Sequence, residues 1–294
     1  MSSQKITELS VVMPTFNEEK VVEKTVKELK GELQKLGLVF EIIVVDDGSK
    51  DRTPEILKKI PDITVIRHPQ NLGNGAAIKT GIKNSRYDKI LTFDADGQHR
   101  PEFIKDLLAH AGKYEMVAGA RHGYKGPLIR QPGKRVLHWL VNYLTSQKIP
   151  DINCGLRIIS KKHILRFENM ICDGFSFYTT SLLIFLGERL PVKFVPIKIN
   201  KRVGKSMVRP RHALDTFILI IKTVTFFSPL KVFLPVSSLL FVVASVSLVY
   251  DFFFRNGIDI SEGTIMVFLS SLLIFFFGLM ADQLALIRKE IHRV

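Results

Sequence analysis

The stretch KILTFDADGQHRPEFI, residues 89–104, decides the fold. It opens with a short apolar run, Lys89–Phe93, which has the length and composition of a buried β-strand. A polar turn, Asp94–Gln98, follows at once, and a helical pattern begins at Pro101. An apolar strand that ends in a polar turn and continues into a helix is the repeating unit of parallel α/β sheets.

The same unit recurs in the preceding part of the chain. Three further apolar runs are predicted to be buried strands: Leu9–Met13, Glu41–Val45 and Ile63–Ile66. Four amphipathic stretches are predicted to be helices: Glu18–Leu36, Pro54–Lys59, Gly75–Asn84 and Pro101–Lys113. The alternation predicts a mainly parallel α/β sheet. Because ligands bind beyond the carboxyl ends of such strands, we expect the chemistry at Pro14–Glu18, Asp46–Ser49 and Asp94–Gln98.

Composition limits the classes of partner. The 294 residues suit one catalytic domain with an appendage. A net charge of +14 and a pI of about 9.7 favour anionic partners: nucleic acid, phosphorylated small molecules or anionic lipid headgroups. The two cysteines, Cys154 and Cys172, form no CxxC motif or Cys/His cluster, so neither a zinc site nor a disulfide framework is expected. Residues 1–10 have no apolar core, so no cleaved signal peptide is expected.

The last third of the chain contains two long apolar segments. Val232–Tyr250 and Thr264–Ala281 are uncharged runs of about 19 and about 18 residues, near the minimum needed to cross a bilayer. Their Phe-rich stretches have no polar face to present to water, which favours two membrane spans over the alternative of two buried core helices.

The charges that flank these segments predict their orientation. Basic residues lie outside both runs: Lys205, Arg209, Arg211, Lys222 and Lys231 before them, and Arg288, Lys289 and Arg293 after them. The linker between the runs is short and slightly acidic, so the large domain and the C-terminus are both expected in the cytosol. We expect an integral membrane protein with a catalytic domain (1–211), an interfacial amphipathic helix (212–230) and a two-helix anchor (231–294). A helix packed on the domain is the alternative for 212–230.

Asp94-Ala95-Asp96 is a candidate metal site. Alternation along an extended segment brings the two carboxylates near one face, where they can hold a divalent cation against a diphosphate. Gln98 adds a neutral oxygen ligand. A D-x-D pattern also occurs by chance in surface loops, but its position directly after a predicted strand favours the metal.

Two other motifs have both a ligand-binding and a structural interpretation. Asp46 and Asp47 can accept hydrogen bonds from a nucleobase or a ribose, whereas Ser49, Asp51 or Thr53 can cap the helix predicted from Pro54. The glycines of the segment 71–77 (NLGNGAA) can let a ligand approach a helix N-terminus, and a tight turn explains them equally well.

Four motifs in a fixed order together resemble glycosyltransferase family 2 with the GT-A fold. They are Pro14–Glu18 (PTFNE), 44–53 (VVDDGSKDRT), 71–81 (NLGNGAAIKTG) and 93–104 (FDADGQHRPEFI). The resemblance extends over residues 8–210 and is greatest to dolichyl-phosphate mannose synthases and polyprenyl-phosphate glycosyltransferases, in which two C-terminal spans are common. Its further segments are Gly119–Arg121, Arg130, Asp151–Arg157 (DINCGLR), Gly174–Phe177 and Arg202–Ser206 (RVGKS).

The resemblance assigns roles to particular residues. Those that it places around the nucleotide of the donor are Pro14, Phe16, Glu18, Val45, Asp47 and Ala95. Asp94, Asp96 and Gln98 would hold Mg²⁺ or Mn²⁺ and the donor diphosphate. The residues that would face the phosphates of donor or acceptor are Arg121, Arg130, Arg202 and Ser206. Asp94, Asp96, Arg121 and Arg130 are the predicted catalytic set.

The sequence departs from this pattern in two places. Met207 stands where a lysine often follows the serine, which puts that phosphate contact in doubt. Tyr178 and Thr180 stand where acidic residues are frequent, and neither is assigned a role. His99 is expected to be a structural neighbour of the metal loop.

The implied reaction is the inverting transfer of mannose or glucose from a GDP- or UDP-sugar to dolichyl or polyprenyl phosphate, on the cytosolic face of a membrane. A phosphate acceptor is largely ionised at neutral pH, since its second pKa lies near ~6, so no catalytic base is required. The alternative is a membrane glycosyltransferase with a hydroxyl acceptor, although no downstream ED pair or QxxRW stretch is found. A nucleic-acid-binding membrane protein is disfavoured, because no basic strand with interleaved aromatics and no recognition-helix pattern occurs. The complete D-x-D motif argues against a catalytically dead scaffold.

Overall fold

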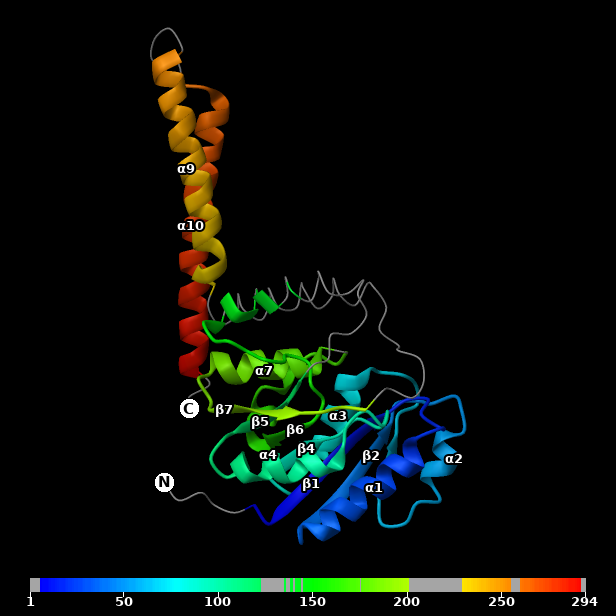
Figure 1. Ribbon diagram of the computed structural model, residues 1–294. Coiled ribbons are helices and arrows are strands. Elements are labelled where there is room, and N and C mark those ends of the chain that lie inside the picture. The colour runs from blue at the N-terminus through cyan, green and yellow to red at the C-terminus, as the bar shows by residue number, and fades with distance from the viewer. Residues whose placement is uncertain are drawn as a thin grey trace. The chain divides into compact units, whose positions relative to one another are not determined.

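The computed structural model describes residues 6–122, 135, 138–139, 141–143, 145–174, 176–200, 229–254 and 260–291 (Figure 1). The chain divides into two compact units, residues 1–219 and 220–294. The predicted boundaries near residues 211 and 230 fall in or beside the segment 201–228, which lies outside the described residues. They therefore stay predictions, as does the interfacial helix over 212–230.

A seven-stranded sheet forms the centre of the first unit (Figure 1). Its strands are β1 (Glu8–Thr15), β2 (Val39–Asp46), β3 (Thr64–Arg67), β4 (Lys89–Thr92), β5 (Met116–Arg121), β6 (Arg157–Ser160) and β7 (Val192–Ile197). They lie in the order β3-β2-β1-β4-β6-β5-β7. β6 runs antiparallel to both of its neighbours, and the other paired strands run parallel. The predicted mainly parallel α/β sheet is confirmed.

Helices cover both faces of this sheet (Figure 1). They are α1 (Val22–Lys35), α2 (Thr53–Leu57), α3 (Asn74–Lys83), the 3₁₀ turn η1 (Pro101–Phe103), α4 (Ile104–Ala111), α6 (Lys161–Arg166), the 3₁₀ turn η3 (Glu168–Met170) and α7 (Phe177–Gly187). The apolar sides of α1, α2 and α4 pack with the sheet in the largest core cluster, and α3 packs on the opposite face. All four strands and four helices predicted from the sequence are present, with ends shifted by a few residues.

The antiparallel strand β6 brings a distant part of the chain beside the end of β4. Its pairing sets Thr92 opposite Arg157 and Leu91 opposite Ile158. Because the two strands run in opposite directions, the segment that enters β6 arrives where β4 leaves the sheet. Residues 151–156 are therefore placed next to the turn that begins at Asp94.

The second unit is a helical hairpin of α9 (Leu230–Phe254) and α10 (Glu262–Ile291). Both helices are long and apolar enough to cross a membrane, with a mean hydropathy of 2.4 in each. Only 11% and 17% of their most apolar windows is buried, which disfavours the alternative of two core helices. The helices pack closely at Gly278, where a β-carbon would lie 2.6 Å from the Cβ of Phe233.

Polar side chains bond with one another where the hairpin turns. The Asp251 carboxylate, at the end of α9, is buried and accepts hydrogen bonds from the Ser261 amide at 2.9 Å and the Thr264 hydroxyl at 2.7 Å. The Ser261 hydroxyl accepts the Thr264 amide at 3.2 Å, an N-cap arrangement for α10. Asp251 thus joins the end of one helix to the beginning of the next.

Candidate active site

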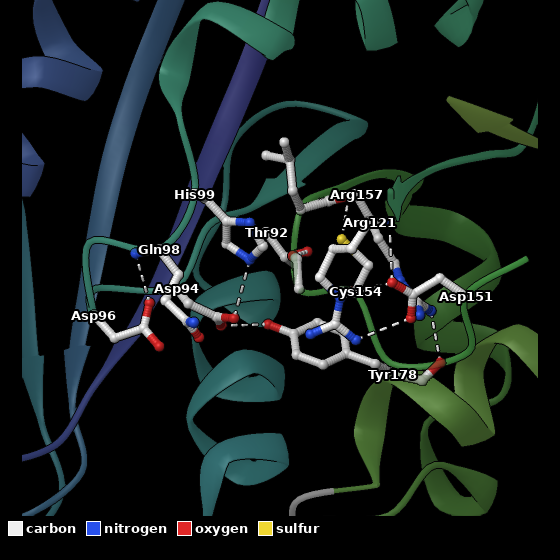
Figure 2. Close-up of polar contacts among 12 residues, drawn as sticks. Thr92, Asp94, Asp96, Gln98, His99, Arg121, Asp151, Cys154, Arg157 and Tyr178 are labelled. Carbon is white, nitrogen blue, oxygen red and sulfur yellow. Dashed lines mark hydrogen bonds and ion pairs between the residues drawn. The ribbon is translucent and has the colours of Figure 1, made fainter. Parts of the chain in front are cut away.

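Asp94 is held from two sides at the carboxyl end of β4 (Figure 2). The Tyr178 hydroxyl donates to Asp94 Oδ1 at 2.8 Å, and His99 Nε2 lies 3.3 Å from Asp94 Oδ2. Tyr178 comes from α7 and His99 from the same turn as Asp94, so two separate segments fix one carboxylate. The expectation that His99 is a structural neighbour of the metal loop agrees with this contact.

The surroundings of Asp94 keep it ionised. Burial alone would raise the pKa of this carboxyl, but the hydrogen bonds and charges supplied by His99, Tyr178 and Arg121 outweigh it and hold the pKa below its ordinary value. The Tyr178 hydroxyl shifts the other way, because burial and the neighbouring Asp94 charge raise its pKa well above 10.0. At neutral pH the pair is therefore a carboxylate and a protonated donor.

Asp96 and Gln98 lie in the same turn as Asp94 (Figure 2). The main-chain N–H of Gln98 donates to Asp96 Oδ1 at 3.0 Å. Gly97, between them, has a φ of +70°, a conformation that suits glycine. A residue outside the turn also holds it in place, since the main-chain N–H of Asn200 donates to the main-chain carbonyl of Gln98 at 2.9 Å. The three predicted metal ligands are thus brought together in one ordered turn.

Gly155 makes room for the Asp94 carboxylate. A β-carbon at position 155 would lie 2.0 Å from Asp94 Oδ2 and 2.7 Å from its Cγ. Only glycine fits this contact, because any larger residue would push the carboxylate away from Tyr178 or His99. The antiparallel placement of β6 therefore contributes directly to the site.

Arg121 ends β5 and forms a two-pronged ion pair with Asp151 (Figure 2). Its Nε and Nη2 donate to the two oxygens of Asp151 at 2.6 and 2.9 Å, and its amide also donates to Asp151 at 3.2 Å. Burial opposes ionisation of Asp151, but these hydrogen bonds and the Arg121 charge outweigh it and lower its pKa. Arg121 is thereby held rigidly near Asp94, and its contact with a substrate phosphate stays a prediction.

Arg157 is a fully buried cation bonded to main-chain carbonyls. It donates to the carbonyls of Ile152, Cys154 and Tyr178 at 3.0, 2.8 and 2.6 Å. Burial lowers the pKa of this guanidinium below the ordinary value of an arginine. These bonds fasten the segment before β6 to α7, the two elements that carry Gly155 and Tyr178.

The two carboxylates that end β2 are already bonded within the protein. Asp47 accepts the amides of Leu72 and Gly73 at 2.9 and 2.8 Å, and His68 Nδ1 lies 2.8 Å from its Oδ1. Asp46 accepts the Ser49 amide at 2.9 Å and lies 3.1 Å from Arg67 Nε. Asp47 thus shapes the loop that precedes α3, and its contact with a nucleoside stays a prediction.

The other residues predicted to surround the nucleotide lie around the same strand ends. Pro14 and Val45 are buried at the ends of β1 and β2, and Ala95 is buried in the metal turn. Phe16 and Glu18 are partly exposed in the loop after β1. Arg130, Arg202 and Ser206 lie outside the described residues, so their phosphate contacts stay predictions.

The helix-cap interpretation of the segment 49–53 holds for Asp51 and is wrong for Ser49 and Thr53. α2 begins at Thr53, and its N-cap residue Arg52 makes no side-chain capping bond. Three side chains instead accept successive amides of the loop after β1, with Ser49 bonded to Asn17, Thr53 to Glu18 and Asp51 to Glu19. Only Asp51 also bonds a helix amide, that of Thr53 at 3.0 Å. Tertiary contact with the first loop takes the place of local capping.

The glycines at the start of α3 pack against protein. The Gly75 and Ala76 amides donate to the carbonyls of Gly174 and Asp173 at 3.1 and 2.8 Å. A β-carbon on Gly75 would lie 2.2 Å from the Cys172 carbonyl oxygen, and Gly73 has a φ of +105°. Close packing against the 172–174 loop, rather than access for a ligand, explains these glycines.

The sequence alone assigns no role to four residues of the site: Asp151, Gly155, Arg157 and Tyr178. The first three belong to the DINCGLR segment, which the resemblance contains without assigning functions. Tyr178 is visible in the sequence only as a departure where acidic residues are frequent. That departure is the signal that could have identified Tyr178, because replacing an acidic side chain by a neutral one changes the charge of a site.

Two family models match separate parts of the chain. Residues 10–168 match glycosyl transferase family 2, and residues 228–287 match the GtrB C-terminal hairpin. An uncharacterised protein of Methanocaldococcus jannaschii is 33% identical over 74% of this chain and 91% of its own length. The undecaprenyl-phosphate 4-deoxy-4-formamido-L-arabinose transferase of Pseudomonas paraeruginosa is 29% identical over 62% of this chain, which spans 58% of that protein.

Solved structures support the fold. Glucosyl-3-phosphoglycerate synthase of Mycobacterium tuberculosis, in complex with Mn²⁺, UDP-glucose and phosphoglyceric acid, matches with a TM-score of 0.60 at 19% identity, over 74% of this chain and 80% of that one. Mannosyl-3-phosphoglycerate synthase of Rubrobacter xylanophilus matches with a TM-score of 0.58 at 17% identity, over 74% and 72%. At this identity the likeness concerns the fold. With a family model that covers more than half of the chain, the protein belongs to glycosyl transferase family 2 and is a glycosyltransferase of the GT-A fold.

Proposed function

We propose that this enzyme transfers a hexose, mannose or glucose, from a GDP- or UDP-sugar to the phosphate of a polyprenyl lipid of the dolichyl or undecaprenyl type. The observation that carries the proposal is the pair Asp94 and Asp96 in one turn at the carboxyl end of β4, with Asp94 kept ionised by its neighbours. The α9–α10 hairpin, with its two candidate spans, supports an acceptor that resides in a membrane.

The turn fits a hard divalent cation, Mg²⁺ or Mn²⁺. Asp94, Asp96 and Gln98 offer carboxylate and amide oxygens, which such ions prefer. Within the described parts of the chain no group of three His, Cys, Asp or Glu side chains could hold a metal alone. This incomplete set suits an ion that takes its remaining ligands from substrate phosphates. When bound, the cation would neutralise charge on the leaving nucleoside diphosphate.

Two relatives bear on the ligands. The M. tuberculosis synthase, which has the same fold, was solved with Mn²⁺ and UDP-glucose, and this supports a metal-bound nucleotide sugar. The P. paraeruginosa transferase is named for an undecaprenyl-phosphate acceptor, and this supports a lipid phosphate. The identity of the sugar and of the base is part of the proposal.

The chemistry asks little of the protein beyond position and charge. One oxygen of the ionised lipid phosphate forms a bond to the anomeric carbon, and the bond from that carbon to the diphosphate oxygen breaks on the opposite face, with inversion. No proton has to be removed from the acceptor, because a phosphate monoester with a second pKa near ~6 is already ionised. Arg121, with Arg130 and Arg202, would orient and neutralise the phosphates, since arginine keeps its charge and binds phosphate oxygens in pairs.

The proposal also includes the membrane. We infer two spans with the catalytic unit and the C-terminus in the cytosol, from the basic residues that flank the two apolar helices. Nucleotide sugars would then reach the site from the cytosol, and the lipid would reach it from the bilayer.

Transfer of label into lipid tests the function directly. Purified protein is incubated with dolichyl or undecaprenyl phosphate, Mg²⁺ or Mn²⁺, and a panel of labelled GDP- and UDP-sugars, and label is counted in the organic phase. We expect label that depends on both the metal and the lipid phosphate. Label that appears only with the corresponding lipid alcohol would favour the alternative hydroxyl acceptor, and label with neither lipid would overturn the proposal.

A further inference from the structure

Tyr178 is buried at the beginning of α7, and its hydroxyl bonds a side chain of another part of the chain. It donates to Asp94 Oδ1 at 2.8 Å. Because the Asp94 carboxylate can only accept, the single proton of the hydroxyl lies in this bond.

The ring of Tyr178 is fixed as firmly as its hydroxyl. The Arg157 guanidinium lies 5.2 Å from the ring centroid and bonds the Tyr178 carbonyl at 2.6 Å. Phe177 packs edge-on against the same ring, with the centroids 5.6 Å apart. The residue is only 6% exposed. Since Arg157 is itself fully buried and bonded to three carbonyls, the hydroxyl can serve as a rigid reference point for Asp94.

The residue type at position 178 decides how much negative charge surrounds the Asp94–Gln98 turn. Within the described residues near Asp94, Asp96 is the other acidic side chain of the turn, and Asp151 is neutralised by Arg121. An acidic side chain at position 178 would add a second carboxylate within reach of Asp94, and the two like charges would repel each other. Tyrosine instead supplies a neutral donor that holds the Asp94 carboxylate without adding a charge to the site.

We propose that Tyr178 is a positioning residue for the metal–diphosphate site. Its hydroxyl holds the Asp94 carboxylate in one orientation, with Oδ1 bonded to the protein, and so sets the affinity of the turn for a divalent cation that arrives with the donor nucleotide. Tyr178 touches neither the substrate nor the reacting atoms in this assignment; it acts through Asp94. The inference rests on the proposed metal-bound nucleotide sugar.

The test is a binding measurement on the full chain in neutral detergent. Mn²⁺ affinity is measured by electron paramagnetic resonance in the presence of saturating UDP and, in parallel, saturating GDP, for the wild type and for Tyr178→Phe. This variant keeps the ring and its Arg157 contact and removes only the hydroxyl. We expect the Mn²⁺ affinity to fall about tenfold, as for the loss of one hydrogen bond to a charged group.

A matched control and a double variant separate positioning from a general structural role. Tyr114→Phe removes a hydroxyl from a tyrosine that packs against His110 just before β5, at the amino end of that strand, and should leave Mn²⁺ affinity unchanged. In an Asp94→Asn background, Tyr178→Phe should cause no further loss, because the two residues act as one unit.

The outcomes are distinct. Equal Mn²⁺ affinity in wild type and Tyr178→Phe would overturn the inference and leave the proposed function standing. A tenfold loss that persists in the Asp94→Asn background would also overturn it, since Tyr178 would then act through the fold. If the wild-type protein fails to bind Mn²⁺ in the presence of UDP and also in the presence of GDP, the proposed metal site and the inference are both overturned.

Discussion

Gly155 lies against the carboxylate of Asp94 so closely that a β-carbon on residue 155 would stand 2.0 Å from Oδ2. We therefore predict that Gly155→Ala displaces Asp94 and lowers transfer by about 100-fold, the effect of a misplacement of about 1 Å at a reacting centre. The measurement is the initial rate of label transfer to lipid phosphate.

The control for this variant is Gly31→Ala. Gly31 lies within α1, and a β-carbon there would have no neighbour within 4 Å. We expect unchanged activity and a stability gain of roughly 0.5–1 kcal/mol, because alanine loses less backbone entropy in a helix than glycine. If Gly155→Ala keeps the activity of this control, Asp94 does not need its present position.

The second prediction concerns the charge of Asp96. Asp96→Asn keeps the size of the side chain and removes the charge opposite the metal, which should cost about 4 kcal/mol of transition-state stabilisation, or roughly 1000-fold in rate. Asp62→Asn, at an exposed residue that pairs with Lys30, is the control and should retain full activity. Full turnover by Asp96→Asn, or by wild type in excess EDTA, would contradict metal dependence.

The third prediction concerns the Arg121–Asp151 pair. Asp151 has a lowered pKa in the folded protein, so its pairing stabilises the fold above its ordinary pKa of 3.8, and this contribution is lost as the pH falls through the lowered value. Asp151→Asn should lower the stability by about 3 kcal/mol at pH 7, since it removes the carboxylate charge that faces a mostly buried cation. The melting-temperature difference between the variant and wild type should shrink below pH 3.8. If the melting-temperature difference instead stays constant as the pH falls, the ionised Arg121–Asp151 pair is not what destabilises the variant.

The fourth prediction is the topology of the hairpin. A reporter fused after Val294 and a second inserted near Gly257 should report opposite sides of the membrane, with the C-terminal one in the cytosol. A glycosylatable site and a cytosol-active enzyme are suitable reporters. The same side for both would rule out two complete spans.

The fifth prediction separates a phosphate site from membrane attraction. Arg130→Ala and Arg202→Ala should each reduce transfer by about 100-fold in neutral detergent, a loss comparable to that of one donor to developing charge. Basic residues that only attract anionic lipid contribute around 1 kcal/mol each near a charged surface and nothing in neutral detergent. The matched control is Arg86→Ala, at an exposed arginine just before β4. If both variants keep wild-type rates in this detergent, the acceptor phosphate binds elsewhere on the protein.

Local patterns predict the parts of the fold that depend on local sequence. Strands β1 to β4 and the helices between them have strong periodicity or apolar runs and lie close to their predicted ends. Both apolar segments form helices, but α10 continues to Ile291, beyond the predicted end at Ala281. The antiparallel insertion of β6 between β4 and β5 is not predicted, because it depends on pairing between residues 92 and 157. Such long-range pairing leaves no periodic signal in either strand.

The candidate site shows the same division. Asp94, Asp96 and Gln98 are predicted together because they share one turn, and the structure confirms that they lie in it. The partners of Asp94 come from far along the chain, with Tyr178 and Gly155 on other elements. The sequence misassigns Ser49 and Thr53 as caps for the related reason that their oxygens serve the loop after β1. Sequence spacing predicts a turn, whereas the residues that support it depend on the whole fold.

The bonded turn of the C-terminal hairpin bears on how the protein is made. An aspartate carried alone into a bilayer is costly, and so are the unbonded amides at the start of a helix. Asp251, Ser261 and Thr264 satisfy one another, but only when both helices are present. The two helices should therefore leave the insertion machinery as a pair, after synthesis of both is complete. A chain that ends at Phe254 would lack the Ser261 and Thr264 groups that bond Asp251, and we expect quality-control proteases to remove it.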